Sequence, residues 1–379
     1  MGFRESDEKE VWQQYRDQFP VVSKFIYLNH AAVSPLCKPA ADAMKALADD
    51  VWQFGSYHYD AWLEVYAGVR TAAARLIGSS PEEIAIVKNT SEGVATIALG
   101  IDWKPGDRIV CFTEEFPANI LPWKRLEREG VIVEELSIHD SLERIDEAAR
   151  GARLLAISFV QYLSGHRADL AAIGEICRRR GCFYFVDAIQ GLGAFPLDVE
   201  ASHIDALAAD GHKWLLGPEG CGILYVRQSR QDEIDPAEFG WTNVASFDDH
   251  SARGKFGMRP DAGRYECGTL NTIGCHGLQA AIEFLLEVGI GRIAPHVQAL
   301  ADGLASGASA KGYEVLGHRN PATGAGIVSV RKPGVSSGHI VRQLKDRNIL
   351  AAPRQGWVRM SPHFYITAAD IDVAVSALP

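Results

Sequence analysis

The feature that most constrains the fold is an alternation of short apolar segments with helical segments between residues 84 and 227. Seven apolar runs have the length of strands: 84–88, 108–113, 131–136, 153–160, 182–187, 204–209 and 221–227. Helical patterns lie between several of them, at 91–100, 119–129, 142–150 and 169–180. Continuous apolar strands joined by helices are typical of a parallel sheet that is covered on both faces. We therefore predict an α/β fold around a mostly parallel, seven-stranded sheet.

The pattern changes after residue 228, which predicts a second domain. Residues 228–268 are rich in Gly, Asp and Arg, and a helix is expected at about 273–288. From 313 to 379, short strands and helices alternate as in a small α+β domain. A chain of 379 residues is also too long for one compact core. We predict a large domain over 20–265 and a small domain formed by 266–379 together with 1–19, where 5–19 form an amphipathic helix.

Charge and cysteine content limit the classes of partner. The formal net charge of -10 argues against nucleic acid and against an anionic membrane surface. No stretch approaches 18 apolar residues, and the first residues lack the apolar segment of a signal peptide. Seven cysteines without a CxxC pair indicate reduced thiols in a cytoplasmic protein. Cys267, Cys275 and His276 lack a fourth ligand at zinc spacing, so we predict no metal site.

Polar residues follow three of the predicted strands, at the edge where parallel sheets bind ligands. Thr90 and Ser91 follow the first strand, where their hydroxyls could cap the next helix or hold a phosphate. Asp187 ends a buried strand and needs a positive partner, either a nearby arginine or a protonated heterocyclic nitrogen.

Lys213 follows the strand at 204–209 and gives these groups a common explanation. A lone lysine is usually a solvated surface charge, but partial desolvation would lower its pKa and make it nucleophilic. Pyridoxal phosphate requires an amine for its aldehyde, an acid for its pyridine nitrogen and a cradle for its phosphate. The chain has no GxxxxGK[ST] motif and no complete dinucleotide-binding glycine motif. The combination predicts a pyridoxal-phosphate site.

The same motifs carry a family resemblance. Val186-Asp-Ala-Ile-Gln190, Ala209-Asp-Gly-His-Lys213, Gly217-Pro-Glu-Gly-Cys-Gly and Tyr265-Glu-Cys-Gly-Thr-Leu-Asn-Thr resemble the class V aminotransferases. These fold-type-I pyridoxal-phosphate enzymes include cysteine desulfurases, selenocysteine lyases and isopenicillin N epimerase. The matching motifs extend over almost the whole chain in the same order. The resemblance implies a fold-type-I transferase architecture and a homodimer with shared active sites.

The resemblance also implies individual roles. Lys213 forms the Schiff base with the cofactor and later carries the Cα proton, Asp187 pairs with the ring nitrogen, and His212 lies near the phosphate. The cofactor-binding set is Thr90, Ser91, Phe116, Asp187, Gln190, His212, Lys213 and Thr269, with Gln190 on the phenolic oxygen and Thr269 supplied across the dimer interface. Arg359 clamps the substrate α-carboxylate, a task suited to a planar guanidinium, with Asn29 and His30 also on the substrate side.

Three departures from the desulfurase pattern bear on the reaction. Phe116 stands where desulfurases place a histidine over the ring, and Asp210 stands where they often have a serine on the phosphate. The stretch 351–359, which precedes and includes the carboxylate-binding arginine, is short and has no cysteine. Desulfuration through a cysteine loop is therefore not expected.

Two positions and the reaction type stay open at this point. Tyr162 could contact the ring or only pack, and Arg354 could bind a second substrate carboxylate or face solvent. Transamination is the leading prediction, with an isopenicillin N epimerase-like racemase or a C–S or C–Se β-lyase as the alternatives. A pyridoxal-phosphate-binding regulatory protein is a further alternative, which predicts loss of the lysine, the acid or the arginine. All three are present.

Overall fold

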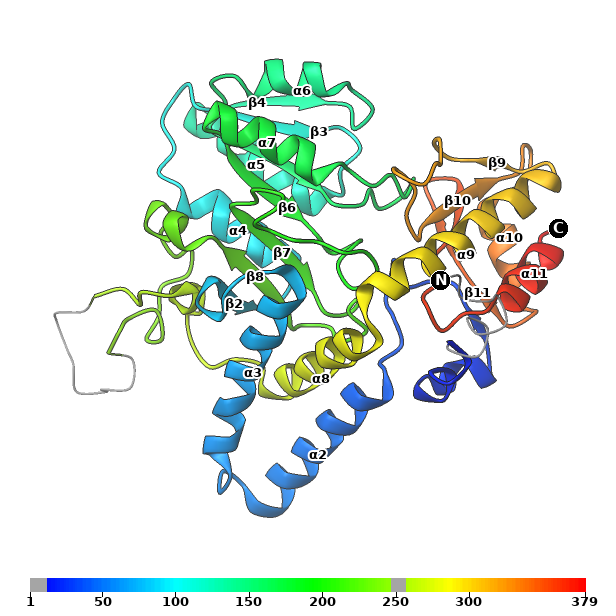
Figure 1. Ribbon diagram of the computed structural model, residues 1–379, viewed down its shortest axis with the longest axis horizontal. Coiled ribbons are helices and arrows are strands. Elements are labelled where there is room, and N and C mark those ends of the chain that lie inside the picture. The colour runs from blue at the N-terminus through cyan, green and yellow to red at the C-terminus, as the bar shows by residue number, and fades with distance from the viewer. Residues whose placement is uncertain (1–11, 247–256) are drawn as a thin grey trace, which may run out of the picture.

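A seven-stranded sheet forms the centre of the larger part of the molecule (Figure 1). The computed structural model describes residues 12–246 and 257–379. The strand order is β2-β8-β7-β6-β5-β3-β4. The strands are β2 (Ile84–Val87), β3 (Arg108–Phe112), β4 (Ile132–Leu136), β5 (Leu154–Ser158), β6 (Phe183–Asp187), β7 (Ala206–Asp210) and β8 (Gly222–Val226). Only β8 runs antiparallel to its neighbours, which confirms the predicted α/β fold and its mostly parallel sheet.

Every strand from β5 to β8 is fully buried. Both faces of this part of the sheet are therefore covered, as is typical of an α/β fold. The connecting helices are α4 (Thr90–Gly100), α5 (Leu121–Arg125), α6 (Leu142–Ala149) and α7 (Leu170–Arg180). Predicted and observed bounds differ by one or two residues, except that α5 is short and continues as a 3₁₀ turn, Leu126–Glu129. Two long helices, α2 (Lys38–Phe54) and α3 (Tyr59–Ile77), form a hairpin that packs on α8 (Thr272–Val288).

The C-terminal part forms a second, smaller unit (Figure 1). Its four-stranded sheet has the order β12-β13-β10-β9. These strands are β9 (Glu314–Val315), β10 (Val328–Arg331), β12 (Ala352–Arg354) and β13 (Trp357–Met360), accompanied by α9 (Ile290–Ala310), α10 (Ser337–Lys345) and α11 (Ala368–Ala377). β1 (Ile26–Tyr27) pairs with β11 (Ile349–Leu350), so the chain leaves this unit after its first strand. The exact domain bounds of 20–265 and 266–379 stay a prediction.

Two segments differ from the sequence expectation or fall outside the structure. Residues 5–11 of the predicted helix 5–19 lie outside the described residues; the described part, 12–19, contains a 3₁₀ turn, Arg16–Gln18, with Trp12 and Phe19 buried. Helix α9 was not predicted, because its glycines and the internal Pro295 weaken the helical pattern. In the described ranges no single helix is long and apolar enough to cross a membrane; only α8 and α9 together pass that test, with a bend of 83° between them.

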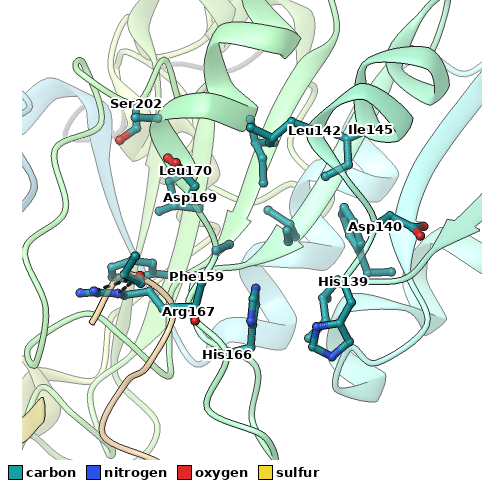
Figure 2. A pocket seen from close by; sticks show the side chains of 18 of the residues that line it. His139, Asp140, Leu142, Ile145, Phe159, His166, Arg167, Asp169, Leu170 and Ser202 are labelled. Carbon is teal, nitrogen blue, oxygen red and sulfur yellow. Dashed lines mark hydrogen bonds between the residues drawn. The ribbon is translucent and has the colours of Figure 1, made fainter. Parts of the chain in front are cut away.

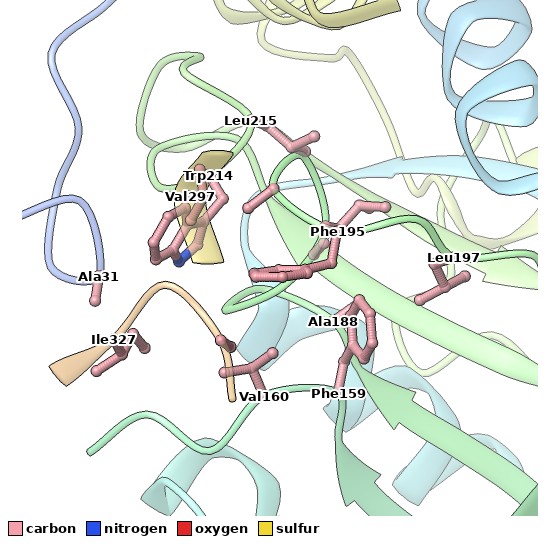
Figure 3. Close-up of a cluster of buried hydrophobic side chains, with 14 of the residues drawn as sticks. Ala31, Phe159, Val160, Ala188, Phe195, Leu197, Trp214, Leu215, Val297 and Ile327 are labelled. Carbon is pink, nitrogen blue, oxygen red and sulfur yellow. The ribbon is translucent and has the colours of Figure 1, made fainter. Parts of the chain in front are cut away.

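A buried cluster anchors the segment that follows Lys213 (Figure 3). Trp214 and Leu215 are buried in one cluster with Phe159 and Val160, which follow β5, and Phe195 lies between the two pairs. Trp214 also meets the C-terminal unit so closely that a Cβ added at Gly326 would lie 2.5 Å from the indole ring. Such dense packing restricts the backbone next to Lys213 to a single conformation.

Helix α4 lies unusually close to the sheet at Gly93. A Cβ added there would be 2.6 Å from the Ala208 Cβ on β7. Gly93→Val is therefore expected to destabilise the protein by about 1–3 kcal/mol and to weaken cofactor binding, because α4 also carries Thr90 and Ser91. Chemical denaturation and a pyridoxal-phosphate titration measure the two effects. Leu99→Ala, at an exposed position of the same helix, is the matched control, and equal effects of the two variants would contradict this packing.

Candidate active site

The carboxyl ends of β5, β6 and β7 open into a pocket of about 570 Å³. Its wall includes residues predicted from the sequence: Thr90, Ser91, Phe116, Asp187, Gln190, His212, Lys213 and Arg359. It also includes Ser158, Tyr162, Asp210, Arg354 and Gln355. The residues come from both structural units, so the pocket lies where the central sheet meets the β12–β13 hairpin.

Lys213 is largely buried in this pocket, and burial is the main cause of its altered acidity. Loss of water lowers the pKa of its amine to about 8, assisted by the positive charges of Arg359 and Arg354. Asp187 and Asp210 act in the opposite direction. At pH 7 about a tenth of this amine is uncharged, and the uncharged form is the one that acts as a nucleophile.

Asp187 is 3% exposed and ends β6. Burial raises the pKa of its carboxyl to about 6, against the hydrogen bond from the Ile189 N–H and the charge of Lys213. That hydrogen bond, 3.1 Å long, reaches Oδ1. Within residues 12–246 and 257–379 no arginine forms an ion pair with Asp187, so the alternative of a structural salt bridge is wrong for this part of the chain.

The start of α4 corrects one expectation. The N-cap is Asn89, whose Oδ1 accepts a hydrogen bond from the Glu92 N–H at 2.9 Å. Thr90 and Ser91 are thus not used for capping, and both line the pocket. The Thr90 Oγ1 accepts a hydrogen bond from the Asp210 N–H at 3.0 Å, which ties α4 to the end of β7. Free N–H groups and hydroxyls at a helix start suit a phosphate.

The Asp210 carboxylate lies against His212. This contact explains how a carboxylate can stand near the proposed phosphate site. His212 Nδ1 lies 3.0 Å from Asp210 Oδ2, although the pair lacks hydrogen-bond alignment. Asp210 Oδ1 is buried without a hydrogen-bond partner among the described residues. The carboxylate and the imidazole together form a pair beside Lys213.

Gln190 and Phe116 form two further parts of the wall. Gln190 donates from Nε2 to the Ala31 carbonyl at 3.0 Å and accepts from Trp214 Nε1 at 3.1 Å. These bonds fix its amide and leave one N–H unused. The Phe116 ring is half-exposed, and its centre lies 5.9 Å from Lys213 Nζ. Phe116 therefore supplies an apolar surface beside the amine.

Arg359 lies on β13 and is 3% exposed. Its Nη1 donates to the Tyr162 carbonyl at 2.8 Å, while Nε is buried without a hydrogen-bond partner among the described residues. Burial lowers the pKa of this guanidinium to about 10, with a contribution from Arg354. The Nε–Nη2 edge therefore stays available for a carboxylate.

The structure corrects the substrate-side prediction for His30. Its ring is fully buried, with Nδ1 2.7 Å from the Ser361 carbonyl and Nε2 2.6 Å from the Tyr365 hydroxyl. Both ring nitrogens are occupied, and His30 does not line the pocket. Asn29 pairs with Ser361 as an isolated bridge and also lies off the pocket wall. His30 instead joins the N-terminal segment to the C-terminal unit.

Thr269 is exposed and lines another pocket, together with Lys88 and Glu92. It does not reach the wall that holds Lys213 in its own chain. Its predicted role in a partner subunit therefore stays a prediction.

Glu115 and Ser158 were not predicted as site residues from the sequence. Glu115 is 5% exposed and accepts hydrogen bonds from the N–H and hydroxyl of Ser158, a pocket residue paired with Asp187 in the sheet. Burial raises the pKa of Glu115 to about 7, and the charge of Asp187 adds to this effect. The sequence signal for Glu115 was an acid two residues after the strand predicted at 108–113, comparable to Asp187 at the end of its strand.

A second pocket of about 610 Å³ lies elsewhere (Figure 2). His139, His166 and Arg167 line it, over an apolar floor that includes Phe159 and Leu170. None of the residues predicted to bind cofactor or substrate lines this pocket. Its larger volume does not make it the reaction site, because the amine and the buried Asp187 lie in the other pocket.

The residues of the Lys213 pocket fit pyridoxal phosphate. The pocket wall brings together an amine of lowered pKa, the buried Asp187, which forms no ion pair with an arginine of the described residues, and two hydroxyls that do not cap α4. When bound, the cofactor supplies an aldehyde for amines and a ring that withdraws electrons from the α-carbon. The fold and the site together define a pyridoxal-phosphate enzyme of fold type I.

Comparison with known proteins gives the family. The model for the class-V aminotransferases matches residues 26–373, so the chain belongs to that family and the resemblance seen in its motifs is confirmed. The uncharacterized aminotransferase YcbU of Bacillus subtilis (strain 168) is 29% identical over 377 residues, 97% of each chain.

Solved structures agree with this assignment. The apo structure of cysteine desulfurase from Thermococcus onnurineus NA1 superimposes with a TM-score of 0.88 at 28% identity, over 96% of each chain. A lysine-to-alanine variant of C-DES, with glycine linked to its pyridoxal phosphate, has the same fold. It gives a TM-score of 0.88 at 24% identity over 96% of this chain and 98% of that one.

The lowered pKa of Lys213 predicts how the cofactor-free protein takes up pyridoxal phosphate. Only the neutral amine attacks an aldehyde, so the association rate should rise with pH up to about 8 and then level off. At pH 7 about a tenth of the amine would be neutral, far more than for an ordinary lysine. Stopped-flow absorbance measures the midpoint.

Asp187→Asn tests the cause of that midpoint. The carboxylate favours the charged amine, so its removal should shift the midpoint below pH 8. A rate that continues to rise beyond pH 10 in the wild-type protein would show an ordinary, solvated lysine instead.

Proposed function

We propose that the protein is an aminotransferase that acts at the α-carbon of an amino acid. The observation that carries this proposal is the placement of Lys213, Asp187 and the free edge of Arg359 around one pocket. Nucleophile, ring partner and carboxylate clamp are the three groups that such a reaction needs from the protein. The presence of all three argues against a purely regulatory cofactor-binding protein.

Each of these residues has a distinct task. Arg359 binds the substrate α-carboxylate through Nε and Nη2, and the Tyr162 carbonyl holds the opposite side of the guanidinium. The neutral Lys213 amine removes the proton from Cα. Asp187 stabilises positive charge on the ring nitrogen. Phe116 shields one side of the pocket from water.

The distribution of cysteines supports transamination over persulfide chemistry. All seven cysteines lie in the described residues, and none lines the Lys213 pocket. Six are buried, and Cys267 lies beside Thr269 in the other small pocket. The β12–β13 hairpin has only Gln355 and Gly356 between its strands, which leaves no room there for a mobile cysteine loop.

Epimerisation is less well supported, because it needs a second proton-transfer group across the ring from Lys213. Phe116 has no titratable group. Tyr162 is nearby, but its hydroxyl already accepts a hydrogen bond from Gln355 Nε2 at 2.8 Å.

A β-lyase acting on a sulfur-containing amino acid is the second candidate. The observation in its favour is the 28% identity to a protein named cysteine desulfurase. Elimination of a sulfur leaving group requires the lysine and the arginine but no cysteine.

The holoenzyme incubated with single amino acids separates these candidates. Transamination predicts pyridoxamine phosphate and a keto acid in equal amounts in a single half-reaction. Sulfide or pyruvate released while the cofactor keeps its pyridoxal form would establish the lyase and overturn the proposal. Inversion of the substrate without keto acid would point to an epimerase.

We further propose a homodimer in which Thr269 of the partner subunit contacts the cofactor phosphate. Its exposed position away from its own chain's cofactor pocket supports this. Sedimentation should give a dimer, and Thr269→Ala should weaken pyridoxal-phosphate binding without altering subunit association. A fully active monomer would contradict the shared site.

A further inference from the structure

A second guanidinium, that of Arg354, reaches the pocket from the strand next to Arg359. Arg354 lies at the end of β12, and Gln355 and Gly356 turn the chain into β13. Both turn residues have positive φ, 47° and 83°, so the hairpin is tight. Arg354 and Arg359 line the same pocket as Lys213.

The strand register places the two arginines on one face of the hairpin. Ala352 pairs with Arg359, and Arg354 pairs with Trp357. Directly paired residues of antiparallel strands project to the same side, and residues two apart share that side. Arg354 and Arg359 are therefore diagonal neighbours, at the spacing of about 7–8 Å typical of such positions.

The hairpin is held against the wall of the pocket. Arg359 donates to the Tyr162 carbonyl, and Gln355 donates to the Tyr162 hydroxyl. Tyr162 thus holds the hairpin at two points, at its turn through Gln355 and on β13 through Arg359. The position of the Arg354 backbone is set accordingly, and its side chain is exposed on the pocket wall.

Arg354 has no anionic partner in the described parts of the chain. No hydrogen bond or ion pair of its guanidinium is found there. The two acids on the pocket wall have other neighbours: Asp187 faces the cofactor ring in the proposed reaction, and Asp210 lies against His212. Like charges at neighbouring positions of a sheet repel, and Arg354 does lower the pKa of Arg359. An anion between the two guanidinium groups would relieve this repulsion.

We propose that Arg354 binds an anionic side chain of the substrate, so that the substrate class is the dicarboxylic amino acids. This inference rests on the proposed function, which assigns the α-carboxylate to Arg359. Aspartate and glutamate carry their two carboxylates two or three carbons apart, within the span of two diagonal arginines whose long side chains converge on the pocket. A neutral side chain gains nothing from Arg354.

The test compares each acid with its neutral isostere on the holoenzyme. The measured quantity is the ratio of kcat/KM for glutamate to that for glutamine, and likewise for aspartate and asparagine. The wild-type ratio should favour the acids. Arg354→Gln should lower this ratio of kcat/KM values by about tenfold. This is the lower end of the effect expected for loss of a charged hydrogen bond, because Arg354 is exposed. Arg354→Glu should lower it further, and the effects should shrink at high salt.

Arg342→Gln is the matched control and should leave the ratio unchanged, because this exposed arginine of α10 forms no side-chain hydrogen bond or ion pair among the described residues. Thermal shift with glutarate against butyrate gives a binding readout that does not depend on the reaction. Glutarate should stabilise the wild-type holoenzyme more than butyrate does, and Arg354→Gln should remove the difference.

The other outcomes decide against this inference or against the proposed function. A ratio unaffected by Arg354→Gln, or a wild-type preference for the neutral isosteres, would overturn it. Weaker pyridoxal-phosphate binding with an unchanged ratio would assign Arg354 to the cofactor phosphate instead. If no keto acid forms but glutarate binding still depends on Arg354, the aminotransferase proposal fails and this inference stands.

Discussion

Lys213→Ala is expected to lower turnover by about 10⁴-fold, the upper range for loss of a positioned proton-transfer group. It should also remove the visible absorbance that the wild-type holoenzyme shows before any amino acid is added. Both effects follow because Lys213 has the lowered pKa of about 8 and lies at the pocket that fits the cofactor. Steady-state assays and absorption spectra measure them on the same samples.

Two further variants show that the effect belongs to this amine. Lys213→Arg keeps a positive charge but cannot condense with an aldehyde, so it should fail in the same way. Lys345→Ala removes an exposed lysine on α10 and should behave as the wild type. Full activity in Lys213→Ala would rule out the assignment of the nucleophile.

Asp187→Asn is the second change with a large expected effect. An amide cannot balance positive charge on the ring nitrogen, so kcat should fall by about 10²–10³-fold, as for loss of one preorganised electrostatic partner. The cofactor should remain bound through Lys213, so the visible absorbance persists while turnover falls. This combination separates Asp187 from Lys213, whose removal affects both.

Asp205→Asn controls for the loss of a buried carboxylate on the same sheet. Asp205 precedes β7, is 7% exposed, and accepts hydrogen bonds from the Tyr184 N–H and Arg230. Its replacement should lower stability, measured by thermal denaturation, without changing kcat of the folded protein. Similar losses of kcat in the two variants would mean that Asp187 acts only through folding.

The parts of the fold that follow from local pattern were predictable. Buried strands such as β6 stand out as continuous apolar runs, and the polar residues at their carboxyl ends predict that Asp187 and Lys213 are neighbours. Helix α9 was missed because its burial depends on alanine and glycine packing and not on a strong apolar stripe.

Predictions failed where a residue's partners come from distant segments. The family resemblance placed His30 on the substrate side, but its ring bonds to Ser361 and Tyr365, more than 300 positions away. Glu115 acquires its raised pKa only when β5 and β6 assemble beside it. Such contacts have no signature in sequence spacing.

The roles assigned to the other pocket residues depend on the attachment of pyridoxal phosphate to Lys213. Borohydride treatment of the holoenzyme, followed by proteolysis and mass spectrometry, would locate the amine that holds pyridoxal phosphate. We expect one modified peptide, with the cofactor on Lys213. Modification of a different lysine, or of none, would contradict it.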